Sequence, residues 1–227
     1  MARTVDVEAH AVRRDAFVDA AQRLMQAKGF EQMSVRDVIA EVGASRGAFY
    51  HYFSSKTELL EAVVTRTVDG ALASAAPVVE DPGLDAVSKL EGLFAGIAQW
   101  KMERSELMLA LTRVWLSDEN TLMRDKMWRH LMLRLTPLLA DIIRQGGQEG
   151  AFSVSSPDDS ARVIVALIHG LNDTAVHMFV ERDEGTVTLA DAEALAGAYV
   201  EALERILGLP AGSLDLIDRR VLERWYT

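Results

Sequence analysis

Residues 34–60, SVRDVIAEVGASRGAFYHYFSSKTELL, decide the fold of this chain. Ser34 can cap a helix whose apolar residues follow at helical spacing, and Gly43 can end that helix after about two turns. A short turn then leads into residues 46–53, which are rich in aromatic side chains. Two short helices joined by a tight turn place the second across the first, where it can enter the DNA major groove. The stretch therefore predicts a helix-turn-helix.

The second short helix combines small, basic and aromatic residues. Gly47 and Ala48 allow the backbone to approach base edges, and Arg46 can reach the O6 and N7 atoms of guanine. Phe49 and Phe53 are expected to be buried anchors of the three-helix unit, because so short a helix needs apolar contacts to hold it. The tyrosines beside them can donate hydrogen bonds to phosphates.

The remainder of the chain has helical periodicity and no useful strand alternation. The expected fold class is all-α, with an N-terminal three-helix unit joined by a long fourth helix, about 55–74, to an all-helical second domain. Pro77 and the following residues up to Gly83 break the periodicity and predict a linker. The predicted domains are 1–66 and 67–227. Further helices are expected at 85–101, 105–116, 119–145, 157–180 and 189–207.

Charge and composition limit the functional classes. The chain has 227 residues and a net charge of −10, which alone would disfavour nucleic-acid binding. Nine of the 24 basic and nine of the 34 acidic residues lie in 1–66, so all the net acidity lies in 67–227. The absence of cysteine excludes disulfides and thiolate metal sites. With no signal-peptide pattern and no 18-residue uncharged apolar stretch, a cytoplasmic protein without membrane contact is expected.

The pattern of residues 34–60 resembles the N-terminal domain of the TetR family, and the resemblance covers about residues 12–64. It implies a homodimer that binds palindromic operator DNA through the first three helices. It further implies base contacts by Arg36 and Arg46 and phosphate contacts by several polar side chains. The DNA-binding residues implied in this way are Ser34, Arg36, Ser45, Arg46, Gly47, Ala48, Tyr50, His51, Tyr52 and Lys56.

Residues 90–135 concentrate tryptophan and methionine, which suit a cavity that accepts varied apolar ligands. An ordinary helical core would have the same composition, and the two interpretations stay open. The resemblance implies a small-molecule effector site in this half of the chain. The candidate ligand-binding residues are Trp100, Trp115, Met123, Met127, Trp128, His169, Asn172 and Asp173.

His169, Asp173 and His177 recur every four residues on one helical face. Ligands along a single helix cannot surround an ion, so a metal site is not expected, nor is any cofactor. These polar groups are expected to line the pocket or to contact a second copy of the chain. Helices near 157–182 and 189–207, with their symmetry mates, would form a four-helix bundle. Its predicted core is Val163, Leu167, Leu171, Leu195 and Tyr199.

The leading hypothesis is a repressor that a small apolar or amphipathic ligand releases from its operator. One alternative is a member of the same family that activates transcription or responds to a protein partner. The other is an all-α enzyme, which the sequence disfavours because it contains no nucleophile–base pair and no paired-carboxylate motif. The expected partners are double-stranded operator DNA, a second copy of the chain and an effector.

Overall fold

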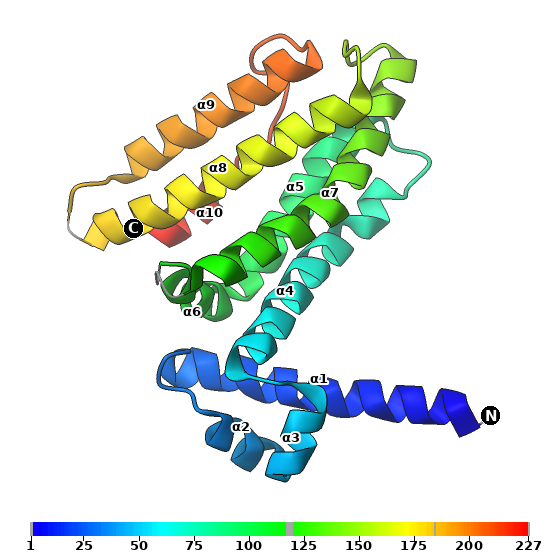
Figure 1. Ribbon diagram of the computed structural model, residues 1–227. Coiled ribbons are helices and arrows are strands. Elements are labelled where there is room, and N and C mark those ends of the chain that lie inside the picture. Colours follow the sequence, from blue (N-terminus) through cyan, green and yellow to red (C-terminus); the bar gives the residue numbers. More distant parts are fainter. Residues whose placement is uncertain (1, 117–119, 184, 227) are drawn as a thin grey trace. The chain divides into compact units, whose positions relative to one another are not determined.

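A computed structural model describes residues 2–116, 120–183 and 185–226, and these residues form helices and connecting turns without a strand. The all-α prediction is therefore confirmed. In chain order the helices are α1 (Ala2–Lys28), α2 (Val35–Val42), α3 (Arg46–Tyr52), α4 (Lys56–Val79), α5 (Ala86–Glu103), α6 (Ser105–Trp115), α7 (Thr121–Glu149), α8 (Pro157–Asp183), α9 (Leu189–Leu207) and α10 (Arg219–Tyr226) (Figure 1).

Two features differ from the expected helices. The fourth helix does not end near residue 74 but continues through Pro77 to Val79. Pro77 lies in the last turn, where a missing N–H removes only one hydrogen bond, and the backbone N–H of Glu80 still donates to Ala76 at 2.9 Å. The short helix α10 lies beyond the last helix that the periodicity predicts.

The chain divides into two compact units. The first comprises residues up to Val68 together with Arg104–Met127, and the second comprises Asp69–Glu103 together with the residues from Trp128 onward. The division lies within α4, between Val68 and Asp69. However, α6 and the start of α7 belong to the first unit, although they lie in the predicted second domain. A domain prediction made along the sequence cannot detect such a return of the chain.

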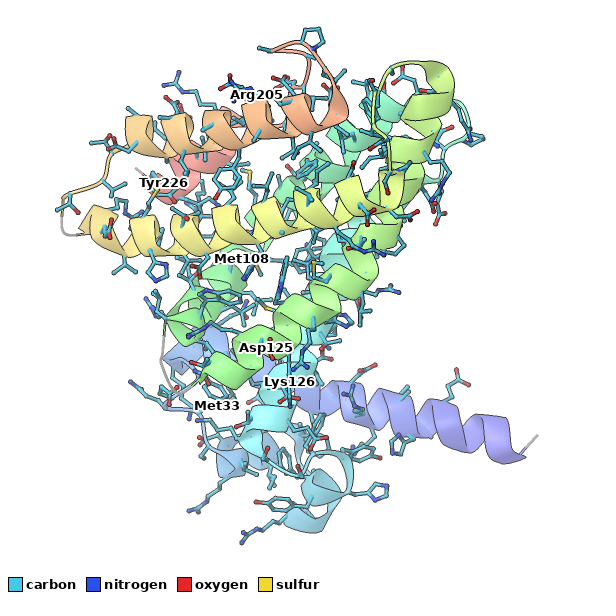
Figure 2. The ribbon with its side chains drawn as sticks, turned by 45° about the horizontal axis from the view of Figure 1, so that its top comes forward. Met33, Met108, Asp125, Lys126, Arg205 and Tyr226 are labelled. Carbon is cyan, nitrogen blue, oxygen red and sulfur yellow. The ribbon has the colours of Figure 1, made fainter. Side chains whose placement is uncertain are left out.

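The first unit has one apolar core. Phe17 from α1, Phe49 from α3 and Leu60 from α4 are fully buried in it. The segment that returns to this unit contributes further buried side chains from α6 and α7, namely Ala110, Val114 and Met123. Lys126 of α7 (Figure 2) also forms an ion pair with Glu61 of α4, with 2.5 Å between Nζ and Oε1.

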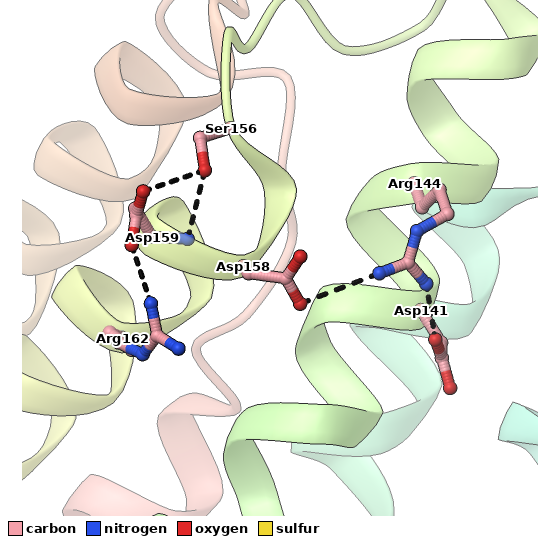
Figure 3. Close-up of polar contacts among 6 residues, drawn as sticks. All are labelled: Asp141, Arg144, Ser156, Asp158, Asp159 and Arg162. Carbon is pink, nitrogen blue, oxygen red and sulfur yellow. Dashed lines mark hydrogen bonds and ion pairs between the residues drawn. The ribbon is translucent and has the colours of Figure 1, made fainter.

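In the second unit α8 and α9 pack side by side (Figure 1). The turn between α7 and α8 is fixed by the ring of Phe152, which lies so close to Gly146 that a Cβ there would come within 2.1 Å of it. Figure 3 shows that Arg144 reaches both Asp141 on its own helix, at 2.5 Å, and Asp158 at the start of α8, at 3.4 Å. These contacts fix the direction in which α8 begins.

The C-terminal segment packs back onto α8 and α9. The hydroxyl of Tyr226 (Figure 2) donates to the carbonyl of Ala175 at 2.8 Å, and Arg219 forms an ion pair with Glu193 of α9 at 2.9 Å. The buried carboxylate of Glu204 accepts from the backbone N–H groups of Gly212 and Leu214 at 3.0 and 2.9 Å. These backbone bonds lower the pKa of Glu204 and hold the segment that leads to α10.

Two helices, Lys56–Val79 and Pro157–Arg182, are long and apolar enough to cross a membrane by length and composition. Buried core helices of other proteins pass the same test. Only 11% of the apolar 18-residue stretch in the second of these helices is buried within the chain. The outer face of α8 is therefore largely uncovered, a point that bears on assembly.

Candidate DNA-binding surface and effector cavity

The turn between α2 and α3 is built by local hydrogen bonds. Ser34 caps α2, and its hydroxyl accepts from the backbone N–H of Asp37 at 3.2 Å. Gly43 ends the helix with a φ of 64°, a left-handed conformation that glycine adopts at little cost. Ser45 then caps α3, where its hydroxyl accepts from the N–H of Ala48 at 3.1 Å. The residues that begin α2, end it and begin α3 therefore all act through neighbouring residues in the sequence.

Asp37 connects α2 to α1. Its carboxylate lies 2.7 Å from the ammonium of Lys28, and it accepts hydrogen bonds from the hydroxyl and the backbone N–H of Ser34 at 2.7 and 2.8 Å. The Lys28 contact, followed by the Ser34 bonds, holds the pKa of the Asp37 carboxyl well below its usual range. The ionised form therefore stabilises the folded first unit.

This pKa shift predicts a specific pH dependence. Because the folded pKa of Asp37 lies below the unfolded value of about 3.9, its contribution to stability is present above that value and is lost as the pH falls. Asp37→Asn is expected to lower the urea midpoint at pH 7, and the difference from wild type is expected to shrink below about pH 4. A difference that stays constant with pH would show that the charge of Asp37 contributes nothing.

The aromatic residues of α3 divide into two groups. Phe49 and Phe53 are buried, and their rings lie 5.6 and 6.3 Å from the ring of Phe17 on α1. Their expected role as anchors is confirmed. Tyr50 is 47% exposed, and His51 is also exposed. The buried pair fixes the helix, and the opposite face of α3 is left open to a partner.

Two exposed arginines lie on α3 and α2. The guanidinium of Arg46 lies 5.6 Å from the centroid of the Tyr50 ring, which holds it against α3. Arg36 is exposed on α2. Within the ranges that the structure describes, neither arginine forms an ion pair, whereas the nearby Arg23 pairs with Glu41 at 3.1 Å. Both cationic groups are therefore available to an anionic or base-edge acceptor.

The other predicted DNA contacts differ in exposure. Ser34, Ser45 and Gly47 are exposed, while Ala48 and Tyr52 are half-buried. The ring of Tyr52 lies 4.6 Å from that of His10 on α1 and 5.7 Å from that of Phe17, so this residue connects α3 to α1. The two serine hydroxyls also serve as helix caps, a role independent of DNA.

Lys56 has internal partners that its sequence context does not indicate. Its Nζ donates to the carbonyl of Phe30 at 2.8 Å and to that of Glu31 at 3.3 Å, and it lies 4.1 Å from the centroid of the Phe30 ring. Its side chain therefore ties the loop after α1 to the start of α4. Arg14, whose guanidinium lies 5.1 Å from the Phe53 ring, is a further exposed cation of this unit.

The predicted ligand-binding residues are divided between the two units. Met123 is buried in the core of the first unit, and Met127 packs against that core. Trp128 belongs to the second unit, where its ring stacks on His169 with 4.0 Å between centroids. Trp100 also lies in the second unit and contacts α4 at Gly70, whereas Trp115 belongs to the first. The tryptophan and methionine content indicates apolar packing in both units.

The second unit contains an apolar cavity of about 170 Å³. It lies among α5, α8, α9 and the C-terminal segment. Six of its lining residues are Phe94, Ala98, Ile168, Leu171, Tyr199 and Leu222. The lining residues come from four distant parts of the chain, so no local sequence signal could have assembled them. Two predicted interface residues, Leu171 and Tyr199, line this cavity.

A polar pair lies next to the cavity. The Nζ of Lys101 on α5 donates to the Oδ1 of Asn172 on α8 at 3.4 Å, and the Nδ2 of Asn172 donates to the carbonyl of Ile168 at 2.7 Å. Burial lowers the pKa of Lys101. Asn172 was among the predicted ligand residues, whereas Lys101 was not.

The other residues of α8 and α9 that were predicted to form an interface or a polar face do not line the cavity. Val163 is 50% exposed, and Leu167 and Leu195 are half-buried. His177 is exposed, and its Nδ1 lies 2.8 Å from the carbonyl oxygen of Asp173. Across the described ranges of the chain, no group of three or more residues is arranged to hold a metal ion.

The helix-turn-helix and its exposed basic face define the class of helix-turn-helix transcriptional regulators. Residues 17–63 match the family described as bacterial regulatory proteins, tetR family, and residues 115–190 match the tetracyclin repressor-like C-terminal domain. The chain therefore belongs to the TetR family of bacterial transcriptional regulators.

Known proteins of similar sequence or structure are also regulators. The transcriptional repressor AcnR of Corynebacterium diphtheriae is 26% identical over 198 residues, which cover 87% of this chain and 89% of AcnR. The repressor KstR2 of Mycobacterium tuberculosis is 25% identical over 62% of this chain and 69% of its own length. The structure of Thermus thermophilus FadR, a TetR-family repressor in complex with lauroyl-CoA, has a TM-score of 0.59 at 18% identity and covers 84% of this chain and 94% of FadR.

Proposed function

We propose that this chain represses transcription by binding a palindromic operator as a homodimer and that a small apolar or amphipathic ligand releases it. The observation that carries the DNA-binding part is the face of α3. There, Arg46 and Tyr50 are exposed on a helix whose opposite side is anchored by the buried Phe49. Such a helix can enter the major groove without rearrangement of its own core.

The roles on this surface follow from chemistry and exposure. Arg46 and Arg36 contact bases, because a guanidinium can bond to both acceptors of guanine. Gly47 and Ala48 allow close approach, and Tyr50, Tyr52, Ser34, Ser45 and His51 contact the backbone of the duplex. Lys56 contributes mainly by fixing the loop at Phe30, and its ammonium adds a positive potential near the phosphates.

The dimer forms through the outer faces of α8 and α9. Val163, Ala166 and Val180 are exposed on α8, and Ala194 and Ala198 are exposed on α9. Small side chains on both helices let the helices of two protomers approach closely in a bundle. Polar residues such as His177 on the same face of α8 suit a protein interface better than lipid. The proposal places the chain in the cytoplasm, without membrane contact.

A charge placed on this face tests the dimer. The double variant Ala166→Arg, Ala198→Arg buries four unpaired guanidinium groups per dimer and is expected to be monomeric by light scattering. Ala73→Arg, at an exposed position of α4, is the matched control and is expected to remain dimeric. A dimeric double variant would place the interface elsewhere.

Release requires that the ligand and the operator prefer different conformations of the protein. The cavity of the second unit provides a site for an apolar ligand, and the lauroyl-CoA bound by FadR supports an effector of amphipathic character. Both α4 and α7 run without a break from one unit into the other. A change of tilt in α4 would alter the spacing of the two recognition helices, which must match successive major grooves.

The test of this function is operator affinity with and without ligand. A coupling of about 1–3 kcal/mol is expected, which corresponds to roughly 5- to 150-fold weaker DNA binding at saturating ligand. Titration of a labelled operator by anisotropy measures it. If ligands that bind the second unit leave the operator affinity unchanged, ligand release is wrong, although DNA binding would stand.

A further inference from the structure

The cavity of the second unit has a cation at one edge. Phe94, Ala98 and Lys101 are spaced by four and three residues, so they lie on one face of α5. The first two line the cavity. On α8, Asn172 follows the lining residue Ile168 by one turn. The hydrogen-bonded pair of Lys101 and Asn172 therefore lies about one helical turn, roughly 5 Å, beyond the apolar wall.

The ammonium of Lys101 is weakly compensated. Its acceptor is a neutral amide oxygen at 3.4 Å, near the long limit for a hydrogen bond. No carboxylate among the described residues forms an ion pair with it. Burial lowers the pKa of Lys101, and no opposing charge raises it. A partly buried cation without a counter-ion reduces folding stability, and a bound anion would offset that loss.

We propose that this cavity binds a monocarboxylate, whose apolar body fills the space beside Phe94 and Ile168 and whose carboxylate accepts a hydrogen bond from Lys101. This proposal rests on the effector function proposed above and names the chemical class of the ligand. Asn172 is a positioning residue, because its bond to the Ile168 carbonyl turns its oxygen toward the ammonium.

The volume limits the apolar body of the ligand. A cavity of about 150 Å³ accepts a benzene molecule, so 170 Å³ accommodates about seven carbon atoms without expansion. The lining is aliphatic and aromatic except for Asp218, whose carboxylate is already paired with Arg220 at 2.7 Å. Lys101, at the edge of the cavity, is therefore the group that distinguishes an acid from an alcohol. Octanoate, with seven carbons beyond its carboxyl group, therefore fits both the cavity and the cation.

Calorimetric titration of the full-length dimer with octanoate and 1-octanol tests the proposal. Wild type is expected to bind octanoate at least tenfold more tightly than octanol, since hydrogen bonds to charged groups contribute this much or more. Lys101→Met is expected to lose this preference and bind the two ligands alike. Asn172→Asp, which gives Lys101 an internal carboxylate, is expected to weaken octanoate binding as well.

Two readouts separate a ligand contact from a structural role. Lys101→Met is expected to raise the ligand-free unfolding midpoint by roughly 2–4 °C, because it removes an uncompensated buried charge. The octanoate affinity of wild type is expected to fall as the pH rises through the lowered pKa of Lys101. The octanoate affinity of Lys101→Met is expected to stay constant over the same pH range. Lys89→Met, at a buried lysine on another face of α5, is the matched control and should keep the octanoate preference.

Several outcomes would overturn the proposal. They are unchanged octanoate affinity in Lys101→Met, equal affinity of wild type for octanoate and octanol, and the absence of octanoate binding. If octanol alone binds and releases the operator, the effector function stands and only the recognition of an anion is wrong. Failure to bind operator DNA in the absence of any ligand would instead contradict the proposed function itself.

Discussion

Phe49→Ala is expected to remove a large part of the stability of the first unit. Phe49 is fully buried and contacts the rings of Phe17 and Phe53. Truncation of a buried phenylalanine to alanine costs about 3–5 kcal/mol, compared with a total domain stability of about 5–15 kcal/mol. Urea unfolding followed by circular dichroism measures the loss, and operator binding should fall with the population of folded α3.

The neighbouring tyrosine provides the control for this prediction. Tyr50→Phe removes one exposed hydroxyl and is expected to change stability by less than about 0.5 kcal/mol, while it weakens operator binding. The two variants separate the anchoring side of α3 from its exposed side. Equal stability of Phe49→Ala and wild type would mean that α3 is not held by this core.

Arg46→Ala is expected to have the largest effect on DNA binding without unfolding. A bidentate contact to guanine contributes about 1–3 kcal/mol, and the proposed homodimer would lose two of them, or about 2–6 kcal/mol in all. Operator affinity should therefore fall by roughly thirtyfold or more, and discrimination against base changes at the contacted position should decrease. Anisotropy titrations with the operator and with its single-base variants measure both effects.

Arg144→Ala is the matched control for Arg46→Ala. Arg144 is an exposed arginine of the second unit, and its partners are Asp141 and Asp158 (Figure 3). Its loss is expected to leave operator affinity unchanged. If the two variants bind DNA equally well, α3 is not the recognition helix.

The helix-turn-helix could be predicted from the sequence because its signals are local. Ser34 and Ser45 each cap a helix within three residues, and Gly43 adopts the left-handed conformation that ends α2. The burial of Phe49 could be predicted because so short a helix needs apolar side chains to hold it. Lys56 is the exception within this segment, because its acceptors lie in a loop 25 and 26 residues earlier in the chain.

The apolar cavity of the second unit could not be predicted in the same way. Its walls combine Phe94, Ile168, Tyr199 and Leu222, which no periodicity connects. The tryptophan and methionine content of residues 90–135 was compatible with either a cavity or an ordinary core, and Met123 is part of the core of the first unit. Composition indicates how much apolar surface must be buried. It does not indicate whether burial leaves a space.

Selection of binding sites from random duplex DNA by the purified protein tests the central claim most directly. The account predicts enrichment of a palindrome whose half-site centres lie one helical turn, about 10 base pairs, or a multiple of it apart. It further predicts that Arg46→Ala loses the enrichment and that Arg144→Ala keeps it. Enrichment of no sequence by the wild-type protein, or of the same palindrome by Arg46→Ala, would contradict the account.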